Sequence, residues 1–140
     1  MIRQTINIEQ YGWDVYVFMA ATADDAPDII KVLNDIGISA AQFMRAERHL
    51  QRAVHDSGMT YSSGRTRESV VVISQSSSPE QTINTFSHEL RHLADDIANA
   101  IHLPNGGEEI AYLTGDIACA LAGSLLHIIC ECPKCRNAGK

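Results

Sequence analysis

Two histidines and one glutamate stand at a spacing that suits metal-dependent hydrolysis. The segment FSHELRHLADD, residues 86–96, places His88 and His92 four positions apart with Glu89 between them. On a helix, positions i and i+4 lie one turn apart on the same face, so both imidazoles can bind one zinc ion at about 2.0–2.1 Å. Glu89 then lies beside the ion, where it can act as the general base for water that the ion activates.

A simpler interpretation is that the two histidines share a helix flank and that Glu89 is solvated. The chain has 6 histidines in 140 residues, so this pattern arises by chance with a probability on the order of 1%. A hydrolytic zinc site usually has three protein ligands and one open position for water, so a further ligand is needed. A metzincin would have glycine and histidine where this chain has Asp95 and Ala98, which excludes that class.

The segment GGEEIAYLTG, residues 106–115, supplies candidates for the third ligand. Together, HELRH and E-x-x-A-Y-x-x-G resemble the motifs of the gluzincin metallopeptidases, over about residues 68–120. The resemblance implies that Glu108 is the third zinc ligand and that Ala111 and Gly115 let the two helices approach closely. Glu109 is the rival ligand, because adjacent helical residues point about 100° apart and only one of them can face the ion.

Helix length constrains this assignment. If the motif helix ran to Leu103, Glu108 would lie about 16 Å along the axis from His92, at a rise of ~1.5 Å per residue. A glutamate side chain cannot cover that distance. We therefore expect either that the motif helix ends near Ala98–Ala100 or that the two helices cross steeply.

Four other side chains near the motif have two possible roles each. Asp95 and Asp96 either orient an imidazole or are solvated acids in the second half of the helix. Tyr112 stands where many gluzincins have an acidic residue; it either hydrogen-bonds to a ligand or an intermediate, or is an ordinary half-buried tyrosine. His102 either stabilises an oxyanion or is a loop histidine without a role.

The C-terminal segment HIICECPKC offers a possible second, structural metal site. His127, Cys130, Cys132 and Cys135 stand within nine residues, and C-x-x-C is half of many structural zinc sites. Most four-ligand sites draw their two pairs from separate segments, so a reduced tail without metal is the alternative.

The bulk composition limits the classes of partner. The formal net charge of -6 would repel a phosphate backbone, so we expect no nucleic acid partner. Arg45, Arg48 and Arg52 follow helical spacing, which indicates a solvated helix face. The sequence shows no signal-peptide run and no span of ~20 apolar residues, so we expect a soluble, cytoplasmic protein that does not cross a membrane.

Hydrophobic periodicity predicts the elements that must position the motif. QTINIEQYGWDVYVFMA predicts two strands in a hairpin, SGMTYSSGRTRE a loop, and SVVVIS a strand directly before the motif helix. The predicted helices span Asp28–Ile36, Ala40–His55, a motif helix from Pro79 with Ser78 as N-cap, and Glu108 to about His127. The expected buried stripe of the motif helix comprises Ile83, Phe86, Leu90, Ala94 and Ile97.

These patterns together predict one α+β domain over residues 1–140, and the gluzincin resemblance implies that this domain is zincin-like. A small N-terminal sheet would end in SVVVIS as the edge strand, followed by the active-site helix and a C-terminal helix that supplies the third ligand. The expected function is a zinc-dependent hydrolase that cleaves a peptide or protein substrate, with the peptide pairing along SVVVIS. The alternative is a non-catalytic binding or regulatory module that keeps the metal only to stabilise its fold. Glu89 distinguishes the two, because only a hydrolase needs a base there.

Overall fold

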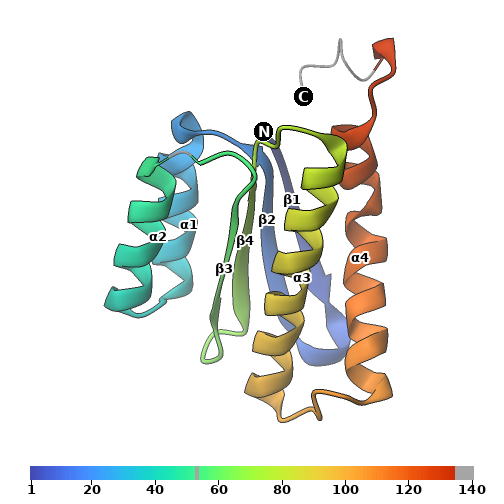
Figure 1. Cartoon of the computed structure of the whole chain (residues 1–140). Coiled ribbons are helices and arrows are strands. Elements are labelled where there is room, and N and C mark those ends of the chain that lie inside the picture. The colour runs from blue at the N-terminus through green and yellow to red at the C-terminus, as the bar shows by residue number, and fades with distance from the viewer. Residues whose placement is uncertain (53, 135–140) are drawn as a thin grey trace.

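Four strands form one mixed sheet in the computed structural model, which describes residues 1–52 and 54–134 (Figure 1). The strand order is β1-β2-β4-β3, with β1 and β2 antiparallel, β2 and β4 parallel, and β4 and β3 antiparallel. The α+β class is therefore confirmed. The strands are β1 (Ile2–Ile8), β2 (Trp13–Ala21), β3 (Gly58–Ser63) and β4 (Glu68–Ser74).

The predicted hairpin is confirmed. One 3-10 turn, η1 (Glu9–Tyr11), joins β1 to β2, and Gly12 closes it in the left-handed conformation with φ at 59°. Glycine adopts this conformation without the steric cost that a Cβ atom adds. A second 3-10 turn, η2 (Ala23–Asp25), leads from β2 into the first helix.

Helices cover both faces of the sheet (Figure 1). On one face lie α1 (Ala26–Ile36) and α2 (Ala40–Arg52), and on the other lie α3 (Pro79–Ile101) and α4 (Glu108–Ile129). The two helices predicted after the hairpin are thus confirmed, although α2 ends before His55. Side chains of β2 alternate between the two cores, with Val15 and Val17 under α3 and α4 and Phe18 under α1 and α2.

The prediction that SVVVIS forms the edge strand is wrong. This segment is β4, which pairs with β2 on one side and with β3 on the other. The edge strand is β3, whose residues GMTYSS lie in the segment predicted to be a loop. Their alternation explains the strand: Met59 and Tyr61 pack toward α1 and α2, whereas Thr60 and Ser62 contact α3. The active-site helix therefore follows an interior strand.

Helix α3 begins where the sequence predicts. The hydroxyl of Ser78 accepts a hydrogen bond from the main-chain N–H of Gln81 at 3.2 Å, and Pro79 follows at the first helical position. The stripe Phe86, Leu90, Ala94 and Ile97 is buried as predicted, but Ile83 is 46% exposed. The helix runs on to Ile101 and ends at His102, which has φ at 60°.

Helix α4 packs beside α3 along its whole length (Figure 1). Its buried side chains, Ile110, Leu113, Ile117 and Leu121, face α3 and the sheet. We expected no span of ~20 apolar residues, but within residues 1–52 and 54–134 α4 alone is long and apolar enough to cross a bilayer by length and composition. Core helices of soluble proteins that pass the same test are mostly buried, whereas 17% of the apolar window of α4 is buried.

The packing of α3 gives a stability prediction. Leu93 is 1% exposed in the core beneath α3 and α4, so Leu93→Ala should lower the free energy of unfolding by about 2–5 kcal/mol. Tyr112 is 69% exposed on α4, so Tyr112→Ala should change it by less than about 0.5 kcal/mol. Urea unfolding followed by circular dichroism measures both. Equal losses in the two variants would contradict the described packing of these helices.

Candidate active site

The two motif histidines converge on one point at the surface of α3. Their Nε2 atoms lie 3.1 Å apart, the ring planes are inclined by 73°, and both side chains are exposed. Two ligands of a tetrahedral zinc ion at 2.0–2.1 Å lie about 3.3 Å from each other, so His88 and His92 fit two corners of such a site. The same separation allows one neutral imidazole to donate a hydrogen bond to the other.

Glu89 is buried, unlike the two histidines beside it. It is 3% exposed, and the hydroxyl of Thr60 donates a hydrogen bond to its Oε2 atom at 2.6 Å. Its other oxygen, Oε1, lies 4.0 Å from Nε2 of His88. A buried carboxylate requires hydrogen-bond partners, and Thr60 provides one while leaving Oε1 next to the histidine pair. The arrangement differs from the solvated glutamate of the simpler interpretation.

Gly58 makes the space for Glu89. A Cβ atom at position 58 would lie 2.7 Å from Cγ of Glu89, 2.8 Å from the carbonyl oxygen of Val72 and 3.0 Å from Cγ2 of Thr85. Any larger residue would force α3 away from the edge strand or displace the Glu89 side chain. The absence of a side chain at Gly58 therefore sets how closely α3 approaches β3.

Asp96 lies one helical turn beyond His92 and also faces β3. Ser62 donates to Oδ2 of Asp96 at 2.7 Å, and the hydroxyls of Ser62 and Ser69 lie 2.7 Å apart. The indole N–H of Trp13 donates to Ser69 at 2.9 Å, which completes a chain of hydrogen bonds into the core. Burial raises the pKa of the Asp96 carboxyl, while the bond from Ser62 and the nearby His92 partly oppose that shift.

Asp95 differs from its neighbour. It forms an ion pair with Arg91, with 2.9 Å between Arg91 Nε and Asp95 Oδ2, while its Oδ1 atom is buried without a hydrogen-bond partner in the described part of the chain. Such an i,i+4 pair at the surface contributes little to stability. Of the two acids that the sequence left open, Asp96 is therefore the one directed toward the sheet beside the histidines.

The structure does not bring Glu108 or Glu109 to the histidine pair. Helix α3 continues nine residues past His92 to Ile101, a length of about 13.5 Å, before the turn into α4. Both glutamates are exposed at that far end. In residues 1–52 and 54–134, no group of three or more His, Cys, Asp and Glu side chains is placed to hold a metal ion.

The flank of α3 that meets α4 is also not the flank that carries the motif. Ala94 and Ala98 pack against Ile110 of α4, whereas Glu89 and Asp96 contact β3. The small residues at the helix contact thus come from α3. Gly115, which the resemblance placed there, would meet nothing within 4 Å if it carried a Cβ atom, and Ala111 and Tyr112 are exposed.

Two further candidates lie away from the motif. His102 caps the C-terminal end of α3 and is exposed, ten positions from His92. In the C-terminal segment, His127 is half-buried in the last turn of α4, and Cys130 is the first residue after that helix. Cys135 lies outside the described residues, so the structure bears only on part of the proposed tail site.

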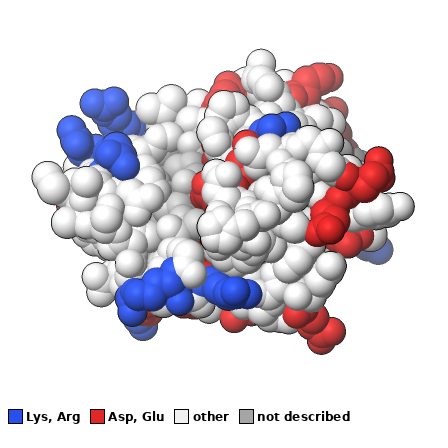
Figure 2. Space-filling model, turned by 90° about the horizontal axis from the view of Figure 1, so that it is seen from below, with Lys and Arg blue, Asp and Glu red and all other residues white. Residues whose placement is uncertain are grey.

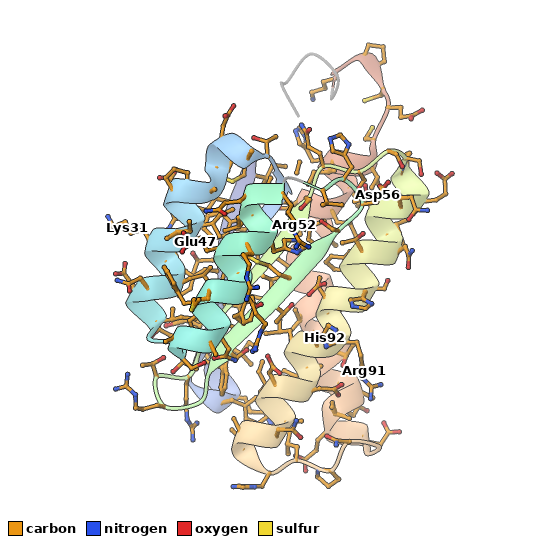
Figure 3. The ribbon with its side chains drawn as sticks, turned by 60° about the vertical axis from the view of Figure 1, so that its left-hand side comes forward. Lys31, Glu47, Arg52, Asp56, Arg91 and His92 are labelled. Atoms are coloured by element: carbon orange, nitrogen blue, oxygen red, sulfur yellow. The ribbon has the colours of Figure 1, made fainter. Side chains whose placement is uncertain are left out.

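A cavity of about 280 Å³ opens beside the motif. Figure 3 shows Asp56 near the beginning of α3 and His92 farther along the same helix. The cavity is lined by Asp56, Ser57, Gly58, Asn84, Thr85, His88 and Glu89.

Two residues of the site, Gly58 and Thr60, were missed in the sequence, because their segment was predicted to be a loop. The alternation of small polar and larger side chains in GMTYSS is the signal that identifies them as part of a strand.

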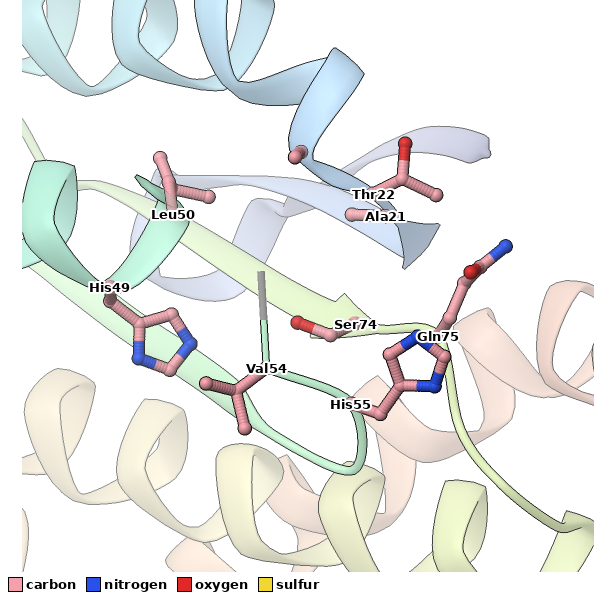
Figure 4. Close-up of a pocket in the computed structure, with 9 residues that line it drawn as sticks. Ala21, Thr22, His49, Leu50, Val54, His55, Ser74 and Gln75 are labelled. Atoms are coloured by element: carbon pink, nitrogen blue, oxygen red, sulfur yellow. The ribbon is translucent and has the colours of Figure 1, made fainter. Parts of the chain in front are cut away.

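A smaller cavity of about 60 Å³ lies between the end of α2 and the end of β4 (Figure 4). His49 and His55 line it, and Nε2 of His49 lies 3.3 Å from the hydroxyl of Ser57. That hydroxyl donates to the carbonyl oxygen of Val54 at 2.6 Å. Its proton is therefore directed at a carbonyl and not at the imidazole, which does not suit a serine nucleophile.

No protein-family model, curated protein or solved structure matches the chain. The gluzincin resemblance therefore rests on the motif residues themselves.

The close approach at Gly58 gives a second stability prediction. Gly58→Ala should lower the free energy of unfolding by about 1–3 kcal/mol, because the new methyl group overlaps Glu89 and the main chain of β4. Gly64→Ala is the matched control, since its Cβ would make an ordinary contact of 3.6 Å with Ala100. Chemical denaturation of both variants tests this. A Gly58→Ala variant as stable as the control would mean that α3 does not lie this close to β3.

The raised pKa of Asp96 predicts a pH effect on stability. The folded chain holds this proton more tightly than the unfolded chain, whose carboxyl has the ordinary pKa of 3.8. The contribution of Asp96 to the free energy of unfolding should therefore decrease as pH rises through 3.8 and the higher folded pKa. Asp96→Asn should gain stability relative to wild type across that interval, measured by urea unfolding in a pH series. The exposed Asp116→Asn is the control, and a pH-independent difference for Asp96→Asn would contradict the prediction.

Proposed function

We propose that this protein is a zinc-dependent hydrolase that cleaves peptide bonds, with Glu89 as the general base. One observation carries the proposal: Nε2 of His88 and Nε2 of His92 lie 3.1 Å apart, and Oε1 of Glu89 is 4.0 Å from Nε2 of His88. Two imidazoles that meet at metal-binding distance, with a fixed carboxylate beside them, supply two of the three usual protein ligands and the base of HExxH chemistry.

Each side chain of the site has its own role in the proposed hydrolysis. His88 and His92 would hold the ion at the mouth of the cavity. A zinc ion bound there lowers the pKa of water toward ~7 and polarises a carbonyl oxygen. Glu89 would accept a proton from water on Oε1 and pass it to the leaving amine, while Thr60 holds the carboxylate in place through Oε2.

The gluzincin-type assignment and the zincin-like fold belong to this proposal and are supported by the two motifs. With α4 in its described position, Glu108 lies beyond reach of the pair. A ligand role for Glu108 thus requires the first turn of α4 to move toward the middle of α3. Without that movement, the remaining positions around the ion are available to water and substrate.

An extended peptide is the substrate that suits the surroundings of the site. The edge strand β3 runs past Glu89, and its outer backbone groups can pair with a peptide, as we had expected for β4. Figure 2 shows basic side chains gathered on the side of α1 and α2 and acidic ones on the side of α4. The net charge of -6 favours a protein substrate over nucleic acid, and the expected setting is the cytoplasm.

The alternative is a non-catalytic module in which the metal only stabilises the fold. It is favoured by the absence of a third protein ligand among the described residues. A structural zinc site needs four protein ligands, however, and two exposed histidines on one helix do not form one. Glu89 again separates the two functions, because a structural site has no use for a buried base next to its ligands.

Zinc binding is the first test. We expect about one zinc ion per chain, lost in His88→Ala and in His92→Ala and kept in Glu89→Gln. His55→Ala, which removes an exposed histidine outside the motif, should bind zinc as wild type does. Elemental analysis and chelator competition measure the content and the affinity. Protein without metal after zinc supplementation would contradict the site, and weaker binding in Glu108→Ala would restore Glu108 as a ligand.

Catalysis is the second test. Glu89→Gln preserves the size of the side chain and removes the proton acceptor, so peptide cleavage should fall by ~10²-fold or more while zinc content stays the same. Digestion of a broad peptide library, read by mass spectrometry, compares wild type with this variant and with wild type in chelator. Equal cleavage by wild type and Glu89→Gln would contradict the role of Glu89 and indicate a contaminating peptidase.

A further inference from the structure

The cavity beside the motif extends from the histidine pair toward the beginning of α3. His88 and Glu89 line one end of it, and Asn84 lies one helical turn earlier, a distance of about 6 Å along the axis. Asp56 and Ser57, from the connection between α2 and β3, line it as well. A group that enters next to the motif thus has room to extend along α3 toward Asp56.

The carboxylate of Asp56 is held in place. Its two oxygens accept hydrogen bonds from the main-chain N–H and the hydroxyl of Ser77, each at 2.7 Å, and its own N–H donates to the carbonyl of Gln75 at 3.0 Å. Asp56 also has φ at 57°, a conformation that aspartate tolerates better than most residues. The two bonds from Ser77 lower the pKa of Asp56, so the group stays ionised at neutral pH.

The cavity is polar and carries negative charge. Two of its described lining residues, Asp56 and Glu89, are acids, and the rest are serine, glycine, asparagine, threonine and histidine, so that no Lys or Arg is among them. Its apolar surface is too small to suit a hydrophobic side chain. Carboxylate and amide oxygens at the walls are acceptors, and they suit a ligand that brings donors and positive charge.

We infer that this cavity binds the basic side chain of a peptide substrate, with the cationic group of an Arg or Lys residue at Asp56 and Asn84. The inference rests on the proposed function, because it places the scissile bond next to the histidine pair. The cation would then lie at the end of the cavity away from the metal-binding position, where repulsion from the ion is weakest. A volume of about 280 Å³ leaves space for a long side chain.

The test separates binding from catalysis. Full-length wild-type protein, kept metal-free by chelator, is titrated with three probes while backbone amide signals are followed by NMR. Acetyl-arginine amide carries the basic side chain, acetyl-citrulline amide has nearly the same shape without charge, and glycine amide carries an α-amine alone. We expect the arginine probe to shift the amides of Gly58, Asn84 and Thr85 and to bind about tenfold more tightly than the citrulline probe.

Two variants test the assignment of the carboxylate. Asp56→Asn should reduce the affinity for the arginine probe to that of the citrulline probe, whereas Asp116→Asn on the exposed face of α4 should leave it unchanged. Asn84→Lys adds a positive charge to the cavity without touching the Asp56–Ser77 bonds, and should abolish binding even if Asp56→Asn folds poorly. The inference would be overturned by any one of these results: no binding of the arginine probe, equal affinity for the arginine and citrulline probes, equal affinity for the arginine probe and glycine amide, or full affinity in Asn84→Lys.

A library digestion distinguishes the failure of this inference from that of the proposed function. Wild type should cleave next to Arg or Lys, and Asp56→Asn should lose that preference while still cleaving other sequences. Cleavage without a preference for sites next to Arg or Lys would overturn the inference but would not contradict the proposed hydrolase activity. Arginine binding without cleavage, in protein shown to hold zinc, would overturn the hydrolase and leave a cation-binding cavity.

Discussion

The burial of one carboxylate against an edge strand is the constraint on which this site depends. Glu89 projects from α3 toward β3, where an ionisable group without partners would be costly. Thr60 supplies the hydrogen bond, and Gly58 supplies the space by having no side chain. Helix, strand and carboxylate are therefore positioned together, and the exposed histidines follow because they sit on either side of Glu89 along the same helix.

Much of the fold follows from local sequence, and the site follows only in part. The hairpin, the helix starts and the cap at Ser78 are encoded by neighbouring residues, and the motif places His88 and His92 on one face by spacing alone. Strand order is different, because β2 ends at Ala21 and its partner β4 begins only at Glu68, so no local pattern predicts that they pair. The strand β3 was missed for a related reason: its small polar face resembles a loop until α3 is packed against it.

The sequence motif suggests a third ligand that the packing of the helices does not deliver. The motif E-x-x-A-Y-x-x-G suggests a partner helix that delivers Glu108 to the ion. In the structure, that helix packs on the opposite flank of α3, and α3 extends well past His92 before the chain turns. Helix length and packing flank are set by core residues such as Leu93 and Ile97, which lie outside the motif. A sequence motif therefore specifies two ligands on one helix more firmly than a third on the next.

The contact between Asp56 and Ser77 has a consequence for motion. Ser77 immediately precedes the N-cap of α3, and Asp56 immediately precedes the segment that enters β3. One carboxylate thus fastens the start of the active-site helix to the start of the edge strand, so that the two walls of the cavity are tied at the same end. Opening of that end requires both Ser77 bonds to break. Hydrogen exchange at the first turn of α3 should therefore report on whatever occupies the cavity, although the exchanging amides lie outside it.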